Sequence, residues 1–232
     1  MGSTPTVENF FSLLLFASFA VPLALFPFTA RNLKNRSEGF SIALYCAFFL
    51  LYNLFFDQLE SSLGNGVYYY IYTVLEFSLF ASLIAKADSS ARFKKTNYLL
   101  SVVFLVFCTW RLLFKNKERM DSYEIAGETL ILLSLIMYFF YIRFKEVDEK
   151  YLYQNHYFWL MMGILVYLGF TFFFNILVNH IDIETGKNYY HFSFVGDIIK
   201  NILFAVSIFY MPRRSGAENR VQSFNAPKLD LI

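Results

Sequence analysis

The chain has 232 residues with a formal net charge of +2; 57% of the residues are hydrophobic, 21% are aromatic and only 16% are charged. Its mean hydropathy is +0.44. This composition is typical of an integral membrane protein. It excludes a separate soluble domain, because no stretch between the apolar runs is long enough to build a soluble core.

Seven apolar segments predict the architecture. A helix that crosses the hydrocarbon core of a bilayer needs about 20 apolar residues. In chain order, the segments that qualify are 9–29, 40–58, 66–86, 96–114, 123–143, 156–179 and 192–211. Charged and turn-forming residues separate them, and a proline with two arginines follows the last one. We therefore expect an all-α, polytopic membrane protein with seven transmembrane helices in residues 1–212 and a flexible tail in residues 213–232.

The distribution of Lys and Arg predicts the orientation. Fourteen of these bases lie in the tail and in the loops after spans 1, 3 and 5, whereas four lie in the loops on the other side. Because cytoplasmic loops are enriched in Lys and Arg, the N-terminus should be outside and the C-terminus cytoplasmic. The basic side should attract anionic lipid headgroups rather than nucleic acid.

Polar residues in the spans are concentrated toward the predicted outer side. Residue numbers convert to depth at about 1.5 Å per residue. Glu76 and Lys200 then lie near the middle of the membrane. Most other polar residues of the spans lie between this level and the outer surface. The inner half is predicted to hold only small hydroxyls.

Glu76 and Lys200 are the central pair of the predicted site. Ionisable groups at membrane depth normally face a partner or water inside the bundle. We expect Lys200 to face the bundle and to be neutralised by Glu76, with Asp197, one turn outward, as the alternative partner. The predicted ligand-binding residues are Glu76, Asp197, Lys200, Asn201, Asn53, Asp57, Tyr72, Arg111, Glu128 and Asn175. An equally weighted interpretation is that the ion pair only fixes the register of the helices.

Several other features have simple interpretations. The run of tyrosines at 68–70 is expected to form an aromatic belt at the outer surface. Cys46 and Cys108 lie inside spans and are expected to be packing residues. We identify no catalytic residue and no metal site, because the histidines lack the local spacing of a zinc site.

Two resemblances accompany these patterns. The segments "YIYTVLEFSLF", "YFWLMMGILVYLGFTFFFNIL" and "DIIKNILFAVSIF" resemble helices 3, 6 and 7 of small uncharacterised bacterial seven-span membrane proteins. That likeness implies the fold and a bacterial inner membrane, but no assigned activity.

The second resemblance is architectural, to microbial rhodopsins. It rests on seven spans, an outside N-terminus, a lysine in helix 7 and a carboxylate in helix 3. It implies retinal on Lys200 with Glu76 as its counterion. The chain departs from that pattern at Thr73, where those pumps usually have arginine, and at Gly196, where an aspartate is expected.

These observations favour a non-enzymatic membrane sensor or receptor-like protein with an outward-facing polar cavity for a small ligand or ion. The first alternative is a transporter or channel, which requires the polar path to continue inward. A retinal-binding protein and a membrane enzyme that acts on lipid are further alternatives. The enzyme comes last, because no clustered histidines or metal ligands accompany Glu76 or Asp197 as a general base.

The orientation can be tested with single cysteines at Ser3, Gly64, Ser89 and Ser215. In intact cells, an impermeant thiol reagent should label only the first two positions, because they precede spans 1 and 3 on the side with few bases. Labelling of the tail cysteine would reverse the orientation and the depth assigned to every residue.

Overall fold

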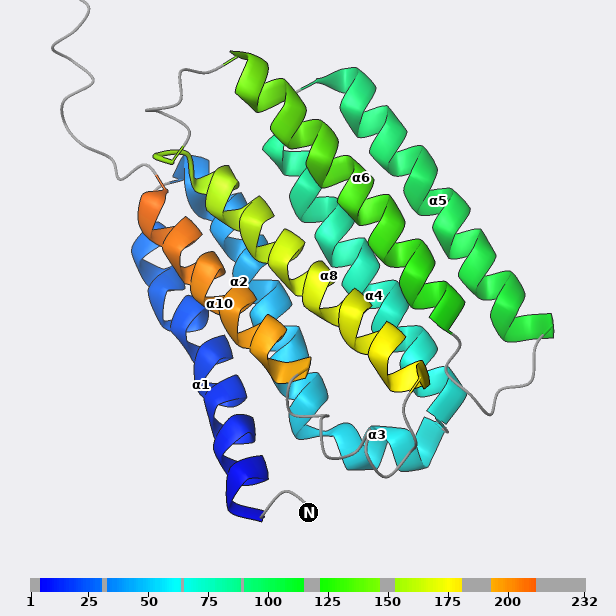
Figure 1. The fold of residues 1–232 in the computed structure, drawn as a ribbon. Coiled ribbons are helices and arrows are strands. Elements are labelled where there is room, and N and C mark those ends of the chain that lie inside the picture. Colours follow the sequence, from blue (N-terminus) through cyan, green and yellow to red (C-terminus); the bar gives the residue numbers. More distant parts are fainter. Residues whose placement is uncertain are drawn as a thin grey trace, which may run out of the picture.

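The computed structural model describes residues 5–30, 33–63, 65–88, 90–114, 122–146, 153–180 and 193–211. In these ranges the chain forms eight α-helices (Figure 1). Their bounds are α1 Pro5–Ala30, α2 Leu33–Leu54, α3 Phe56–Leu63, α4 Asn65–Ala87, α5 Ala91–Phe114, α6 Ser122–Glu146, α8 His156–His180 and α10 Ser193–Tyr210. The predicted tail lies outside the described residues.

The all-α prediction is confirmed, and each of the seven predicted segments corresponds to one long helix. Six of these helices, α1, α2, α4, α5, α6 and α8, are long and apolar enough to cross a membrane. The chain is therefore an integral membrane protein by the length and composition of its helices. α10 has 18 residues and is not among these six. A seventh span and the orientation of the termini stay predictions.

The boundaries of two predicted elements were wrong. α2 begins at Leu33, seven residues before the predicted span, because the segment "LKNRSEG" contains Leu, Lys, Arg and Glu, which are good helix formers. The predicted loop after span 2 contains the short helix α3. Backbone hydrogen bonds from Phe55 to Leu51 and from Leu59 to Phe55 connect α2 to α3 with little interruption. Polar residues thus end the apolar run without ending the helix.

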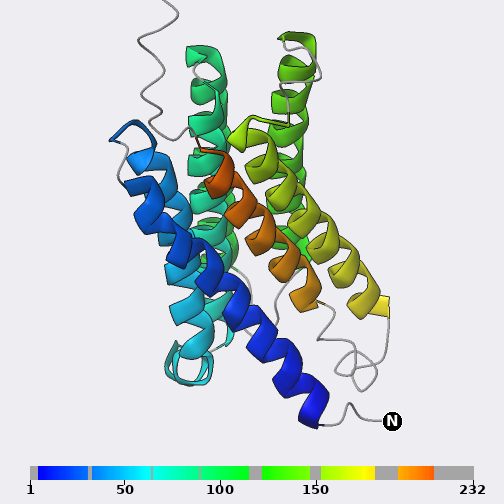
Figure 2. The same cartoon turned by 90° about the vertical axis from the view of Figure 1, so that its left-hand side faces the viewer.

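The long helices run alternately up and down and pack side by side (Figures 1 and 2). α10 packs against α8, α1 and α2, and α4 packs against α2, α5, α6 and α8. We call the end where α1, α4, α6 and α10 begin the N-terminal end, and the other the opposite end. α3 lies across the N-terminal end. The interface of α2, α4, α8 and α10 forms the centre of the bundle.

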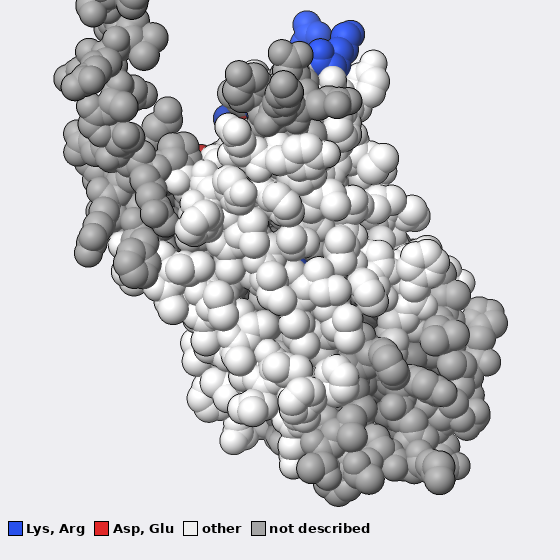
Figure 3. Space-filling model, turned by 60° about the vertical axis from the view of Figure 1, so that its left-hand side comes forward, with Lys and Arg blue, Asp and Glu red and all other residues white. Residues whose placement is uncertain are grey.

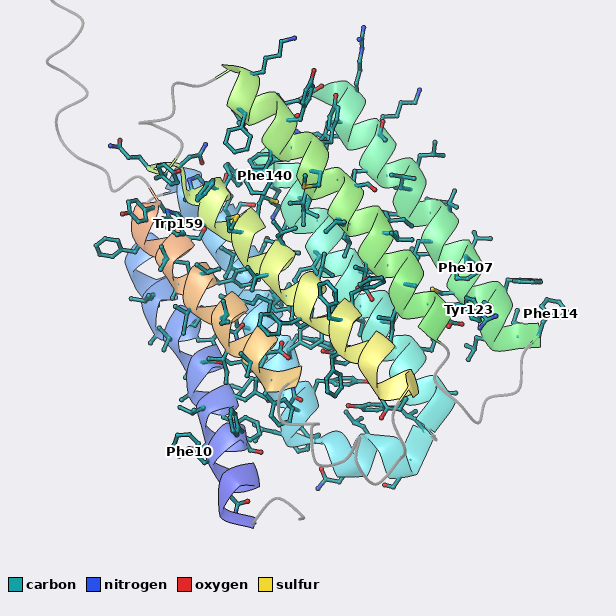
Figure 4. All side chains as sticks on the ribbon, viewed as in Figure 1. Phe10, Phe107, Phe114, Tyr123, Phe140 and Trp159 are labelled. Carbon is teal, nitrogen blue, oxygen red and sulfur yellow. The ribbon has the colours of Figure 1, made fainter. Side chains whose placement is uncertain are left out.

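The sides of the bundle are apolar, and exposed bases gather at the opposite end. Large side chains such as Phe10, Phe114 and Tyr123 project outward (Figure 4). Figure 3 shows Lys and Arg at the tip of the opposite end. The exposed bases described there are Arg92, Lys94, Lys95 and Lys145. An apolar side surface with charges at one tip is the pattern expected for helices surrounded by lipid.

Two glycines allow α8 and α10 to approach closely. A Cβ atom added to Gly163 would lie 3.2 Å from Cβ of Leu203 and from the Phe204 ring. A Cβ atom added to Gly196 would lie 2.8 Å from Cβ of Phe170. Small residues bring helix backbones together in membrane proteins because they remove this bulk. The close contact also sets the height of α10 relative to α8.

We predict that Gly196→Ala destabilises the protein by about 1–3 kcal/mol, the usual cost of overpacking. Cβ of Phe170 is fixed to its backbone, so the helices must separate to admit the new methyl group. Gly169→Ala on α8 is the matched control, because a Cβ atom there would meet nothing within 4 Å. Thermal unfolding of both variants in one detergent is the measurement. Equal unfolding temperatures for the two variants would contradict the packing argument.

Candidate functional site: a charged cluster in the centre of the bundle

Lys200 lies in the middle of α10 and is completely buried, with 0% of its surface exposed. Gly196, Phe204 and Ser207 lie one or two turns away and are also buried, so position 200 belongs to the inner face of α10. A buried ammonium group without partners would cost several kcal/mol. Its three N–H donors therefore need acceptors within the bundle.

Two oxygen atoms accept hydrogen bonds from the Lys200 ammonium. Nζ lies 2.5 Å from Oδ1 of Asp197, three residues earlier on α10. It also donates to the hydroxyl of Tyr45 on α2, at 2.7 Å. The prediction that Lys200 faces the bundle is confirmed, but its direct ionic partner is Asp197 rather than Glu76.

Aromatic rings surround the same ammonium group. Its nitrogen lies 3.7 Å from the centroid of the Tyr167 ring on α8 and 4.9 Å from that of Tyr45. The rings of Phe80 and Phe19 have their centroids 5.8 and 5.9 Å away. Desolvated cation–π contacts of this kind contribute about 2 kcal/mol or more. In the described part of the chain, the aromatic rings thus stabilise the charge on the sides of the ammonium group that the two oxygen atoms do not occupy.

Tyr45 connects Lys200 to Glu76. Its hydroxyl accepts from the ammonium and donates to Oε1 of Glu76 on α4, at 3.1 Å. Tyr167 is a second hydrogen-bonding neighbour of the Glu76 carboxylate, and the hydroxyls of Tyr167 and Tyr72 lie 3.4 Å apart. We call the residues of this network the core cluster; they are Asp197, Lys200, Tyr45, Glu76, Tyr72 and Tyr167. The core cluster joins α2, α4, α8 and α10 near the middle of each helix.

Glu128 on α6 places another carboxyl group beside the core cluster. Its side chain is only 4% exposed, and Oε1 has no hydrogen-bond partner in the described part of the chain. Its carboxylate is close enough to Glu76 for the two charges to repel each other. A buried carboxylate in such a position requires a proton or an external cation.

Other predicted site residues lie elsewhere. Asn201 is buried against α1, where it donates to Oγ of Ser18 at 2.9 Å. Arg111 forms an ion pair with Glu124, with 2.7 Å between Nε and Oε1, near the N-terminal end. Asn53 donates to the backbone oxygen of Phe49 one turn earlier. The side chains of two further predicted residues, Asp57 and Asn175, lie outside the described part of the chain.

Two predictions about packing residues have opposite outcomes. Tyr68 is only 2% exposed, and its ring stacks on that of Tyr52, with 4.8 Å between the centroids. The predicted aromatic belt was therefore wrong for this tyrosine, because α4 turns position 68 toward α2. Cys46 and Cys108 are buried free thiols, as predicted.

Sequence reasoning missed the two tyrosines that complete the core cluster. Tyr45 and Tyr167 lie within the apolar stretches "ALYCAFF" and "GILVYLGF". Their positions far from either end of a span are the only signal that could have marked them, because membrane tyrosines are usually found at the interfaces. Assigning their partners requires the packing of α2 and α8 against α10.

The surroundings of Lys200 fit a paired ammonium better than a lysine that carries retinal. A Schiff base requires space beside Nζ for a long polyene. In the described structure this atom is fully buried, and four aromatic rings have their centroids within 5.9 Å of it. Retinal on Lys200 stays an untested prediction.

We predict that Lys200→Met lowers the free energy of unfolding by about 3–5 kcal/mol, because it leaves buried carboxylates without their cation. Adding Asp197→Asn should recover part of this loss, since it removes the direct partner of the lysine. Lys94→Met, at an exposed position on α5, is the control and should have little effect. Unfolding in a denaturing detergent titration is the measurement. A Lys200→Met protein as stable as the control would show that the described pairing does not stabilise the fold.

Comparisons with known proteins leave this site to be interpreted from its own geometry. No protein family, no curated protein and no solved structure matched the chain.

Proposed function

We propose that the protein is a non-enzymatic membrane sensor or receptor-like protein whose core cluster responds to a small, positively charged ligand or ion. The observation that carries this proposal is the excess of carboxylates over bases in and beside the core cluster. Asp197 and Glu76 share the single ammonium group of Lys200, and Glu128 lies close enough to Glu76 for their charges to interact. Oε1 of Glu128 has no partner in the described structure.

The charge balance supports a cationic ligand. Unpaired charge in a low-dielectric interior costs several kcal/mol, and a bound cation would offset part of that cost. Arg111, which lies near Cys108 as Glu128 does, forms an ion pair with Glu124. In the described part of the chain, no three His, Cys, Asp or Glu side chains are grouped to hold a metal ion. A singly charged ion or an ammonium-bearing molecule therefore fits the cluster better than a transition metal.

The partial exposure of Asp197 supports a route by which a cation reaches the core cluster from the N-terminal end. Its side chain is 18% exposed, whereas that of Lys200 is 0% exposed. A cation that arrives there would meet Asp197 first and would compete with the lysine for it. Release of Lys200 would weaken its bonds to Tyr45 and its contact with Tyr167, which belong to α2 and α8. A ligand that favours one of two such arrangements shifts the population of the whole bundle.

The exposed bases at the opposite end form a surface through which a change in helix packing would be passed to other molecules. Arg92, Lys94 and Lys95 are exposed where α5 begins, and Lys145 is exposed near the end of α6. We place this end in the cytoplasm of a bacterial cell, against anionic headgroups of the inner membrane. A membrane enzyme that acts on lipid is less well supported, because Glu76 and Glu128 are each only 4% exposed.

The proposal predicts that a small cation stabilises the protein. The chain in lipid nanodiscs is heated in chloride salts of sodium, potassium, calcium or choline at one ionic strength. A ligand at a concentration 100 times its Kd adds about 2.7 kcal/mol to the free energy of unfolding. Glu128→Gln should abolish the response. Glu124→Gln, one turn earlier on α6, should retain it, because Glu124 is paired with Arg111 and does not adjoin Glu76.

The sensor mechanism requires movement as well as binding. Spin labels at Lys94→Cys and Gln154→Cys, both exposed near the opposite end, report the distance between α5 and the beginning of α8. The stabilising cation should change this distance in the wild-type background but not with Glu128→Gln. The proposal fails if no cation stabilises the protein. It also fails if the stabilising cation leaves the distance unchanged.

A further inference from the structure

A second polar cluster lies at the opposite end of the same helices. A carboxylate oxygen of Glu38 on α2 lies 2.8 Å from Nε2 of His156 at the start of α8, and the other accepts a hydrogen bond from Tyr157. On α10, Ser207 donates to the backbone oxygen of His156 at 2.9 Å. Lys86 on α4 donates to Ser41 and acts on the charge of Glu38. We call these residues the opposite-end cluster.

This cluster corrects the prediction that the inner half holds only small hydroxyls. Glu38 was assigned to a loop because the predicted span began at residue 40. Since α2 begins at Leu33, Glu38 lies within the helix and faces α8. Glu38 has a side chain that is 26% exposed, and that of His156 is 12% exposed. The opposite-end cluster is therefore in contact with both the bundle and its surroundings.

A single apolar layer separates the two clusters. Each of the four helices carries a polar residue in both clusters and fully buried apolar residues between them. The separating residues are Ile42 on α2, Phe80 and Ile84 on α4, Met161 and Ile164 on α8, and Phe204 on α10; each is at most 1% exposed. Glu38 and Tyr45 are seven residues apart, as are Lys200 and Ser207. On α4 and α8 the corresponding spacings, Glu76 to Lys86 and His156 to Tyr167, are ten and eleven residues. At about 1.5 Å per residue, the polar residues of the two clusters are therefore about 10 to 17 Å apart along the helices.

We propose that the interface of α2, α4, α8 and α10 is a proton pathway, and that the apolar layer is its gate. Both clusters consist of groups that exchange protons, and chains of Asp, Glu and His inside a membrane bundle are a usual means of proton transfer. Hydrophobic constrictions close such paths by excluding water. This activity is additional to the proposed sensing of a cation and does not depend on it.

The proton transfers follow the described contacts. A proton entering at the N-terminal end binds Asp197. The Tyr45 hydroxyl, which lies between Lys200 and Glu76, passes one proton to Glu76 and takes another from the ammonium. The ammonium is then restored by the proton on Asp197. When water enters the gate, Glu76 releases its proton to that water. Glu38, which is hydrogen-bonded to His156, accepts it and releases it at the opposite end. One full cycle therefore moves one proton and returns every group to its starting state.

Other charged or titratable groups adjoin the two clusters. Glu128 and Cys46 adjoin the core cluster, whose own members Tyr72 and Tyr167 are also titratable. Arg143 adjoins the opposite-end cluster, whose members Lys86 and Tyr157 also carry titratable groups. Lys86 and Arg143 are positively charged and hold Glu38 and the end of α4 in place by hydrogen bonds and charge. The pathway therefore passes from a negative region to a more positive one.

The test measures proton entry into liposomes that contain the full-length chain. A potassium gradient with valinomycin drives protons inward, and a trapped pH dye reports their arrival. Because the described gate is closed, Phe204→Ala should raise the rate several-fold above wild type. Phe209→Ala, which removes a lipid-exposed ring on the same helix, is the matched control and should match wild type. In the Phe204→Ala background, Glu76→Gln or Glu38→Gln should remove the added flux.

Three results would overturn the proposal. The first is a folded Phe204→Ala protein with no more flux than protein-free liposomes. The second is flux that persists when both carboxylates are replaced. The third is equal entry of sodium, reported by a sodium dye under the same potential, which would indicate a non-selective leak. If Phe204→Ala fails to fold, as judged by circular dichroism and gel filtration, Ile42→Ala takes its place. Cation-dependent stabilisation without proton flux would remove this inference and leave the proposed sensor intact.

Discussion

The buried ammonium group of Lys200 constrains the arrangement of the central helices. A positive charge buried inside a bundle of apolar helices is tolerated only where it is paired, and here its contacts come from several helices. Asp197 is available on α10 itself, but the hydroxyl of Tyr45 and the ring of Tyr167 reach the ammonium only when α2 and α8 pack against α10. Glycines at 163 and 196 permit that approach. The charge and the close packing therefore depend on each other.

The side chains in and beside the core cluster differ in how firmly their neighbours hold them. Tyr45 is completely buried and packed between Phe49, Phe80 and Phe204, so the ring that bridges Lys200 and Glu76 has little freedom. Glu128, by contrast, has an oxygen with no partner in the described residues. A site with one rigid bridge and one unsatisfied carboxylate can change its charge without losing its framework. That combination suits a group that responds to ions better than a purely structural ion pair.

Much of the fold could be predicted because it depends on local composition. Apolar runs of about 20 residues identified seven helices, and the cost of a buried charge placed Lys200 inside the bundle. The position of Tyr45 between α4 and α10 could not be predicted, since it depends on which faces of three helices meet. Glu38 was missed for a different reason. Charged residues mark the end of an apolar run, but they are also good helix formers, so α2 continues through them.

The lengths of the helices have a consequence for the surrounding lipid. α10 has 18 residues and is about 27 Å long, whereas α5 has 24 residues and is about 36 Å long. In the predicted arrangement, in which α10 is the seventh span, a hydrocarbon layer about 30 Å thick would have to thin beside α10, and α5 would have to tilt. Thinning beside α10 brings the headgroup region closer to Asp197, which lies only four residues after the start of that helix. Bilayer thickness would then control how readily water hydrates the carboxylate of Asp197, making lipid chain length a determinant of the state of the buried charges.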